Sequence, residues 1–231
     1  MNHEKDASTI IRFPKEARQK IDFFVTSPDL RHNDSHSTIP WGGKMAKFFG
    51  NLNAVMIVSL LLAIALMLGL HPGEVTANSV MRWAHLFFGV LWIGLLYYFN
   101  FVQVPQMPNI PDEAKPAVSK HIAPAALFYF RWAALFTVIT GLLVAYLSGY
   151  VHQAMVLQGP YRLIGVGMWI AIIMAANVWF IIWPNQKKVL GIVPAEADAK
   201  AAAGKMAMMA SRTNTLLSLP MFYTMVSFNG G

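Results

Sequence analysis

The sequence contains no cysteine among its 231 residues. A chain without thiols forms no disulfides, thiolate metal sites or iron–sulfur clusters, and it cannot attach a c-type haem through a C-x-x-C-H motif. Any redox cofactor must therefore be held by histidine, methionine or other ligands that lack a thiol.

Charged residues are also scarce. They make up 13% of the chain, against roughly 25% in soluble domains, whereas hydrophobic residues make up 56%. The mean hydropathy is positive, at +0.46. Because a water-soluble fold would have to hide all of the apolar stretches at once, the composition indicates an integral membrane protein in a lipid bilayer.

The net charge of +7 does not indicate nucleic acid as a partner. No basic patch with interleaved aromatic residues appears, and such a patch is the usual footprint of a nucleic-acid interface. In a membrane protein, lysine and arginine collect in the cytoplasmic segments instead. We therefore expect no nucleic-acid binding.

Apolar stretches predict an all-α fold, an integral membrane helical bundle of about five transmembrane helices. Four stretches are long, and a shorter fifth contains Pro220; they are 52–70, 81–104, 123–150, 163–183 and 213–228. An interfacial amphipathic helix is the alternative for the fifth stretch. Residues 1–50 are expected to be a cytoplasmic N-terminal tail and 51–231 the transmembrane domain, in which the alanine-rich segment 189–210 forms a cytoplasmic loop with a helical turn.

The distribution of basic residues predicts the orientation of the bundle. Most lysines and arginines near membrane ends fall in segments 1–51, 105–122 and 184–212, whereas the alternate loop 151–162 offers only Arg162. Cytoplasmic loops carry the excess of positive charge in membrane proteins. The chain should therefore have its N-terminus inside and its C-terminus outside.

Few polar residues lie inside the apolar stretches, and each is a functional candidate because an ionisable group in a bilayer is costly. No aspartate or glutamate is among them, which argues against a proton pump or an ion-coupled transporter. The set is His85, Asn100, Arg131 and Asn177. Asn177 lies beside a small-residue face, and we expect it to donate a hydrogen bond across a helix interface.

His85 is the leading ligand candidate. It lies about one turn inside the expected outer end of its helix, and Gly89 and Trp92 share its helical face. A neutral imidazole is a good axial ligand for haem iron, and a glycine one turn away leaves space for a porphyrin plane. The alternative is a histidine that hydrogen-bonds to a neighbouring helix.

Further ligands are expected on the same side of the membrane as His85. His71 and His152 lie in or near outer loops, whereas His121 lies on the cytoplasmic side, so a six-coordinate b-type haem would pair His85 with His71 or His152. Met168 and Met225 are additional outer-side candidates, weaker than the histidines. Arg131 is either a counter-charge for a haem propionate or another anion, or a side chain that extends to the cytoplasmic surface.

Four segments resemble a known family. They read RWAHLFFGVLWIGLLYYFNF (82–101), LFYFRWAALFTVITGLLVAY (127–146), IMAANVWFIIWPNQKKV (173–189) and NTLLSLPMFYTMVS (214–227). Over about residues 80–229 the chain resembles the membrane, N-terminal domain of bacterial membrane-bound urate oxidases. The resemblance implies a shortened, stand-alone form without the family's cytochrome c domain, in the bacterial cytoplasmic (inner) membrane.

The chain departs from the family pattern at several polar positions. Thr213 and Asn229 stand where the family has histidines in its closing segment. In the third span, Phe128 replaces a histidine and Ala133 replaces an acidic residue. Of this polar set only His85 is kept, so the resemblance does not imply that urate oxidation transfers intact.

Three functions remain open at this point. The first is a membrane-embedded b-haem electron-transfer protein, or a subunit of a larger respiratory or oxidoreductase complex, that works with a periplasmic cytochrome c. The second is a haem-free structural or assembly subunit. The third is a component of a urate-oxidising or related purine-oxidising enzyme. Other membrane subunits are expected partners, and whether the chain is itself an enzyme is left undecided.

Overall fold

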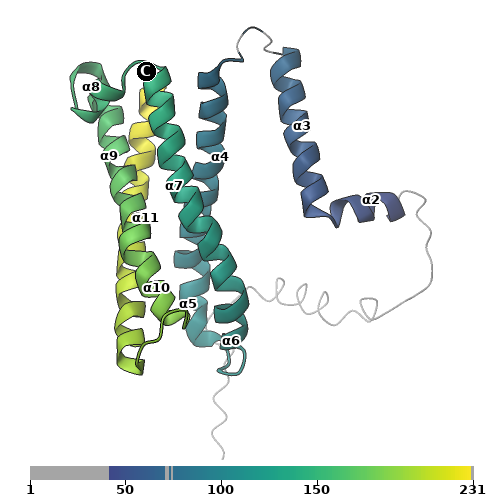
Figure 1. Cartoon of the computed structure of the whole chain (residues 1–231), viewed down its shortest axis with the longest axis vertical. Coiled ribbons are helices and arrows are strands. Elements are labelled where there is room, and N and C mark those ends of the chain that lie inside the picture. The colour runs from purple at the N-terminus through teal and green to yellow at the C-terminus, as the bar shows by residue number, and fades with distance from the viewer. Residues whose placement is uncertain (1–41, 71–72, 74, 230–231) are drawn as a thin grey trace, which may run out of the picture. The chain divides into compact units, whose positions relative to one another are not determined.

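The computed structural model describes residues 42–70, 73 and 75–229, and every regular element among them is helical (Figure 1). The chain divides into two units, residues 1–65 and 66–231. Most of the expected tail 1–50 lies outside the described residues, and its last part forms helix α2 (Gly42–Phe49).

Helix α3 (Leu52–Leu70) is a membrane helix of simple composition. It has 19 residues with a mean hydropathy of 2.5, it contains no ionisable residue, and none of its residues is buried. An apolar helix of this length spans the hydrocarbon core of a bilayer. The span expected at 52–70 is confirmed with the same bounds.

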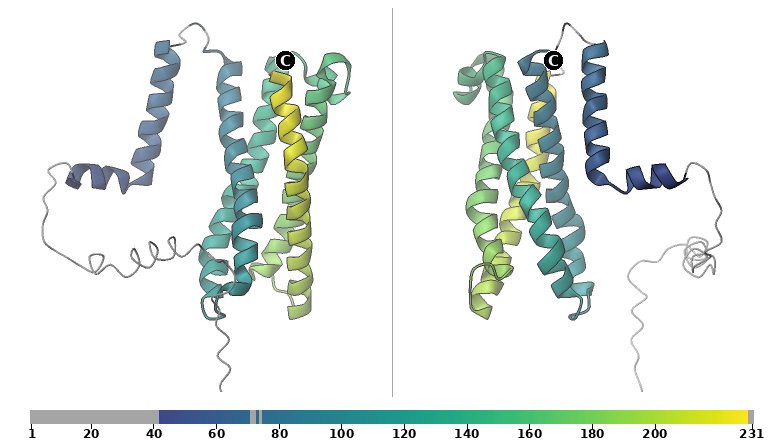
Figure 2. Two further views of the ribbon diagram at one scale, coloured as in Figure 1. Left: turned by 180° about the vertical axis from the view of Figure 1, so that it is seen from behind. Right: turned by 45° about the vertical axis from the view of Figure 1, so that its right-hand side comes forward.

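The second unit is a bundle of four long helices that run side by side (Figures 1 and 2). They are α4 (Ala77–Tyr97), α7 (Ala123–Leu147), α9 (Arg162–Asn177) and α11 (Ala197–Asn229). Helix α4 packs on α7, α7 on α9, α9 on α11 and α11 on α4, which closes the bundle. The all-helical membrane bundle expected from the sequence is confirmed.

Short elements connect the long helices. At one end lie α8 (Val151–Met155) and the 3₁₀ turn η6 (Gly159–Tyr161). At the other end lie η3 (Tyr98–Gln103), α5 (Val104–Gln106), η4 (Met107–Asn109), α6 (Lys115–Ala117), η5 (Val118–Ile122), η7 (Val178–Ile182) and α10 (Trp183–Val189). Because the second end carries most of the lysines, we call it the inner end, after the predicted orientation, and the end that includes α8 the outer end (Figure 1).

Proline explains three widened helical turns at the inner end. The π-helical segments η3, η5 and η7 each end two residues before a proline, at Pro105, Pro124 and Pro184. Proline lacks a backbone N–H, and its ring clashes with the carbonyl four residues earlier. A π turn removes that conflict without ending the helix.

The last helix is longer than expected. In the part of the chain that the structure describes, four helical stretches are long and apolar enough to cross a membrane: Leu52–Leu70, Ala77–Asn109, Lys115–Leu147 and Gly159–Val189. Helix α11 is not among them, yet it continues without a break for 33 residues and includes Pro220. The loop expected at 189–210 is therefore wrong for residues 197–210, where alanines, the strongest helix formers, extend the helix. That α11 crosses the membrane stays a prediction.

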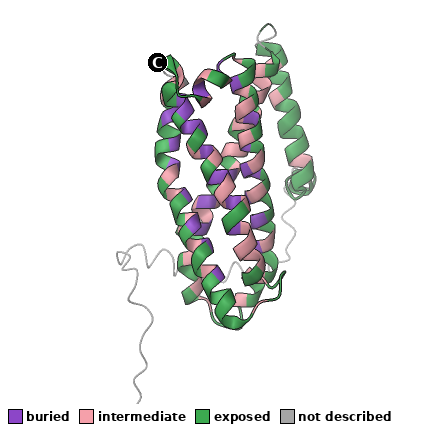
Figure 3. Ribbon diagram, turned by 60° about the vertical axis from the view of Figure 1, so that its left-hand side comes forward, coloured by how far each residue is buried: buried purple, intermediate pink, exposed green. Residues whose placement is uncertain are grey.

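The buried residues lie along the four-helix bundle (Figure 3), and its core combines apolar packing with an amide pair between two helices. Trp92 and Leu96 on α4 and Phe130 on α7 are almost completely buried. Between α9 and α11, Nδ2 of Asn177 donates to the carbonyl oxygen of Ala210 and to Oδ1 of Asn214, both at 2.8 Å. The expected hydrogen bond of Asn177 across a helix interface is confirmed.

Candidate functional site

His85 is held by the neighbouring helix. Its Nδ1 lies 2.9 Å from the carbonyl oxygen of Thr137 on α7, and the hydroxyl of Thr140 lies 3.5 Å from the same nitrogen. A carbonyl only accepts, so Nδ1 donates, and Nε2 of the neutral ring then carries the free lone pair. The hydrogen bond to a neighbouring helix is present, and it leaves the second ring nitrogen available.

A glycine on α7 makes room for the imidazole. A Cβ at Gly141 would lie 2.8 Å from Cε1 and 3.0 Å from Nδ1 of His85, closer than real Cβ contacts. Gly141 follows Thr137 by four residues, so the hydrogen-bond acceptor and the gap lie on one face of α7. Thr137 and Gly141 were not among the residues predicted from the sequence, although their Thr-x-x-x-Gly spacing is compatible with a close helix contact.

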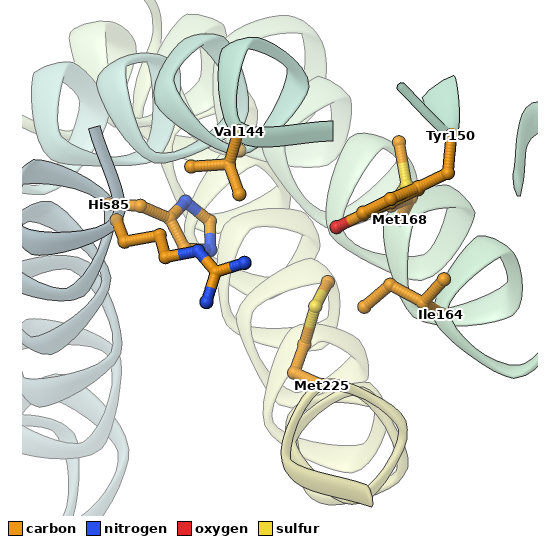
Figure 4. Close-up of a pocket in the computed structure, with 8 residues that line it drawn as sticks. His85, Val144, Tyr150, Ile164, Met168 and Met225 are labelled. Carbon is orange, nitrogen blue, oxygen red and sulfur yellow. The ribbon is translucent and has the colours of Figure 1, made fainter. Parts of the chain in front are cut away.

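A cavity of about 380 Å³ lies beside the imidazole at the outer end. Its lining residues come from α4, α7, α9, α11 and the connection after α7; they are Arg82, His85, Gly141, Val144, Tyr150, Ile164, Met168 and Met225. In Figure 4, the ring of His85, the hydroxyl of Tyr150 and the thioether of Met225 point toward the same space. The cavity therefore combines one imidazole, two thioethers, a phenol and a guanidinium.

Tyr150 closes the outer side of this cavity. Its ring stacks on Tyr161 with centroids 5.2 Å apart and meets the edge of Phe228 at the same distance. Burial raises the pKa of the Tyr150 hydroxyl, and the positive charge of Arg82 opposes part of that effect. The phenol is therefore neutral at physiological pH and can donate a hydrogen bond into the cavity.

The structure does not bring His152 into the cavity beside His85, and the pairing of His85 with His71 stays a prediction. His152 lies exposed on α8 and is not among the residues that line the cavity, and His71 lies outside the described residues. Sidedness in the membrane places a residue at the outer end, but it does not determine which way the side chain points. Met168 and Met225, the alternative outer-side candidates, do line the cavity with His85.

Gly89 and Trp92 lie in helix interfaces, apart from the cavity. A Cβ at Gly89 would meet the methyl group of Thr137 at 3.8 Å, an ordinary packing distance between α4 and α7. Trp92 is completely buried in the bundle core, where its Nε1 has no hydrogen-bond partner. From the sequence, both residues were expected beside a porphyrin. In the structure, Gly89 packs against α7 and Trp92 fills the core of the bundle.

Arg131 belongs to a different region of α7. Its guanidinium carbon lies 3.9 Å from the ring centroid of Trp183 and 5.2 Å from that of Phe128. Ten residues separate it from Gly141, which is about 15 Å along a helix axis. One cofactor in the cavity therefore does not bring Arg131 and His85 together, which argues against the haem-propionate alternative for Arg131 and leaves its alternatives of another anion or the cytoplasmic surface.

Comparison with known proteins gives one match. Residues 153–229 match the family described as urate oxidase N-terminal. No curated protein and no solved structure matches the chain. The matched region runs from α8 through α11 and includes Met168 and Met225, whereas His85 precedes it. Over residues 153–229 the chain is similar to the urate oxidase N-terminal family, as the motifs at 173–189 and 214–227 predicted.

Proposed function

We propose that this chain is a membrane-embedded b-type haem protein that transfers electrons at the outer end of its bundle. The observation that carries the proposal is the setting of His85: Thr137 fixes the proton on Nδ1, so Nε2 offers its lone pair, and the imidazole lines a cavity with two methionine thioethers. A bound haem would supply reversible one-electron chemistry at its iron.

The donor set of the cavity fits haem iron. Imidazole with thioether is an established axial pair for haem, and it raises the reduction potential relative to two imidazoles. The carbonyl of Thr137 on Nδ1 makes Nε2 a stronger ligand, as such partners do for metal-bound histidines in general. Among the described residues, His85 with Met225 or Met168 is therefore a better axial pair than His85 with His152.

The other polar groups of the cavity suit the same cofactor. Arg82 brings a guanidinium, which pairs well with carboxylates such as the haem propionates. The neutral hydroxyl of Tyr150 adds a hydrogen-bond donor.

The position of the cavity favours a partner outside the cytoplasm. With the predicted orientation, the outer end of the bundle faces the periplasm of a bacterial inner membrane. A periplasmic cytochrome c, or another subunit of a larger membrane complex, is then the natural electron partner. Both partners and the membrane of residence are part of this proposal.

A reduced-minus-oxidised absorption spectrum of the purified chain, with a pyridine haemochrome assay, tests the proposal. We expect a low-spin b-type signal that His85→Ala abolishes. His121→Ala is the matched control, because His121 is exposed at the inner end and should leave the signal unchanged. A wild-type protein without haem would support the haem-free structural subunit. A full b-type haem signal in His85→Ala would show that His85 serves helix packing and does not bind haem.

The methionine ligand can be identified in the same assay. Met225→Leu and Met168→Leu keep the volume of the side chain but remove the thioether, and the variant that loses the axial ligand should become high-spin. Met206→Leu is the control, since Met206 lies half-exposed on the inner half of α11. A low-spin spectrum in both single variants and in the double variant would exclude methionine ligation.

The family match favours a second candidate, a component of a purine-oxidising enzyme. If urate is a substrate, adding it to the oxidised wild-type protein should deplete urate and reduce the haem. His85→Ala, without haem, should do neither. A spectrum that is unchanged by urate would remove this candidate and leave electron transfer between protein partners.

A further inference from the structure

Arg131 is a cation inside a membrane helix that no carboxylate of the described chain neutralises. The ion pair recorded among the described residues, between Lys115 and Asp112, lies in the connection before α7. A charged side chain at this depth is costly unless a partner stabilises it. Within the described residues, Arg131 is therefore stabilised by groups other than a carboxylate.

Aromatic rings hold the guanidinium in place. Its carbon lies 3.9 Å from the ring centroid of Trp183 and 5.2 Å from that of Phe128, both within the range of a cation–π interaction. The indole of Trp179 donates a 3.0 Å hydrogen bond to the backbone carbonyl of Arg131, which fastens α7 to the π turn η7. The position of the arginine is thus set by three rings from two parts of the chain.

The hydrogen-bonding capacity of this guanidinium is almost unused. Its recorded side-chain bond, from Nη1 to the carbonyl of Leu127, is 3.5 Å long, at the outer limit of a hydrogen bond. A guanidinium has five N–H donors. The structure therefore presents a fixed cation, partly exposed, with donors left for an external anion.

A second cation lies on the same indole. Nζ of Lys187, on α10, is 6.0 Å from the ring centroid of Trp183. Arginine binds phosphate oxygens in a bidentate manner, and lysine adds a compact positive charge. Two cations on one tryptophan at the inner end of the bundle match a phosphate group.

The surface next to Arg131 is apolar and faces outward. The rings of Phe128, Trp132 and Phe136 follow one another along α7, with centroids 6.4 and 6.0 Å apart, and each is more than a third exposed. A row of exposed rings on a membrane helix contacts acyl chains. A phosphate bound at Arg131 would therefore be continuous with a hydrocarbon surface.

We infer that Arg131, Lys187 and Trp183 form a binding site for the phosphate group of an anionic phospholipid, whose acyl chain lies along Trp132 and Phe136. Basic pockets between membrane helices on the cytoplasmic side are known to bind anionic headgroups. The adjacent apolar row commits the site to a lipid instead of free phosphate. The inference does not depend on haem.

Native mass spectrometry of the full chain, delipidated in detergent and titrated with phosphatidylglycerol, phosphatidylcholine or inorganic phosphate, tests the site. We expect wild type to bind one phosphatidylglycerol roughly tenfold more tightly than phosphatidylcholine, the ratio typical of one charge-assisted contact. Arg131→Gln and Lys187→Gln should each remove most of that preference, whereas Arg131→Lys should keep part of it.

Arg162→Gln is the matched control, because it removes one exposed positive charge at the outer end of the bundle. It should keep the preference of wild type. Equal loss in Arg162→Gln would show a general charge effect and overturn the site. Equal binding of both lipids by wild type would also overturn it, and competition by inorganic phosphate at equal strength would assign the site to a free anion. Unchanged thermal unfolding in phosphatidylcholine establishes that each variant is folded.

Discussion

The two ends of the bundle hold a polar side chain in the membrane by different means. At the outer end, His85 bonds to a backbone carbonyl and fits against a glycine, and it lines a cavity. At the inner end, Arg131 is held by aromatic rings and faces an apolar surface. A polar side chain in a membrane helix is thus stabilised by the groups that the neighbouring segments supply, and these groups also determine what it can bind.

The two ends of the bundle also differ in how the helix backbones are arranged. At the outer end, glycines allow close approach: a Cβ at Gly165 would overlap the carbonyl of Ala154 on α8, and one at Gly167 would overlap the hydroxyl of Thr224 on α11. At the inner end, prolines and π turns shape the helices instead. Because glycines allow the helices to approach closely at the outer end, even a glycine-to-alanine substitution there should alter the cavity.

The largest expected effect concerns which end faces which side of the membrane. A reporter that is active only outside the cytoplasm should be active when fused after Gly231, because α11 ends beside the outer loops in the predicted orientation (Figure 2). The same reporter fused in the connection at Asn109 should be silent. If the reporter were active at Asn109 and inactive after Gly231, the orientation would be the reverse of the predicted one, and His85 would lie toward the cytoplasm.

A smaller effect is expected when the glycine beside His85 is filled. Gly141→Ala should displace the imidazole by a few tenths of an ångström, lower the haem content, and destabilise the bundle by about 1–3 kcal/mol. Haem per polypeptide and the thermal unfolding midpoint measure both effects. Gly94→Ala is the control, since a Cβ there meets nothing within 4 Å, and it should be neutral or slightly stabilising. Equal behaviour of the two variants would contradict the role of Gly141.

The smallest expected effect is a dependence on alkaline pH at the outer end. Because burial raises the pKa of Tyr150, the unfolded chain releases this proton near pH 10, whereas the folded chain keeps it to higher pH. Stability should therefore fall as pH rises through that range, by at most about 1.4 kcal/mol per pH unit for one proton. Tyr150→Phe should flatten the decline in unfolding midpoint between pH 9 and pH 11, and Tyr146→Phe, at an exposed tyrosine, should not.

The membrane helices were predictable because apolar length alone determines them. The bounds of α3 agree with the sequence, and the other three spans differ only at their ends, mostly because the helices continue beyond the apolar stretch. The first half of α11 was missed because Lys200, Lys205 and Arg212 interrupt its hydropathy, although its alanines favour a helix.

The site was only partly predictable. His85 and the two methionines follow from their residue types and their expected side of the membrane. The identity of the helix that packs against His85 does not follow from residue type or membrane side. The sequence therefore could not show that Thr137 and Gly141 determine the position of the imidazole. For the same reason, the shared face of His85, Gly89 and Trp92 was assigned to a cofactor, whereas Gly89 packs toward Thr137 and Trp92 fills the core.

The three π turns also have a consequence for insertions and deletions in the chain. A π turn holds one more residue than the α turn it replaces, so it marks a position where a residue has been accommodated without moving the helix on either side. Removing one residue from Val178–Ile182 would restore an α turn and leave Trp183 and Lys187 facing as before relative to Asn177 and the outer half of α9. The orientation of the cations at the inner end relative to the amides that join α9 to α11 should therefore survive a single deletion in this segment, whereas a single deletion in the α-helical part of α9 would rotate the two sets by about 100°.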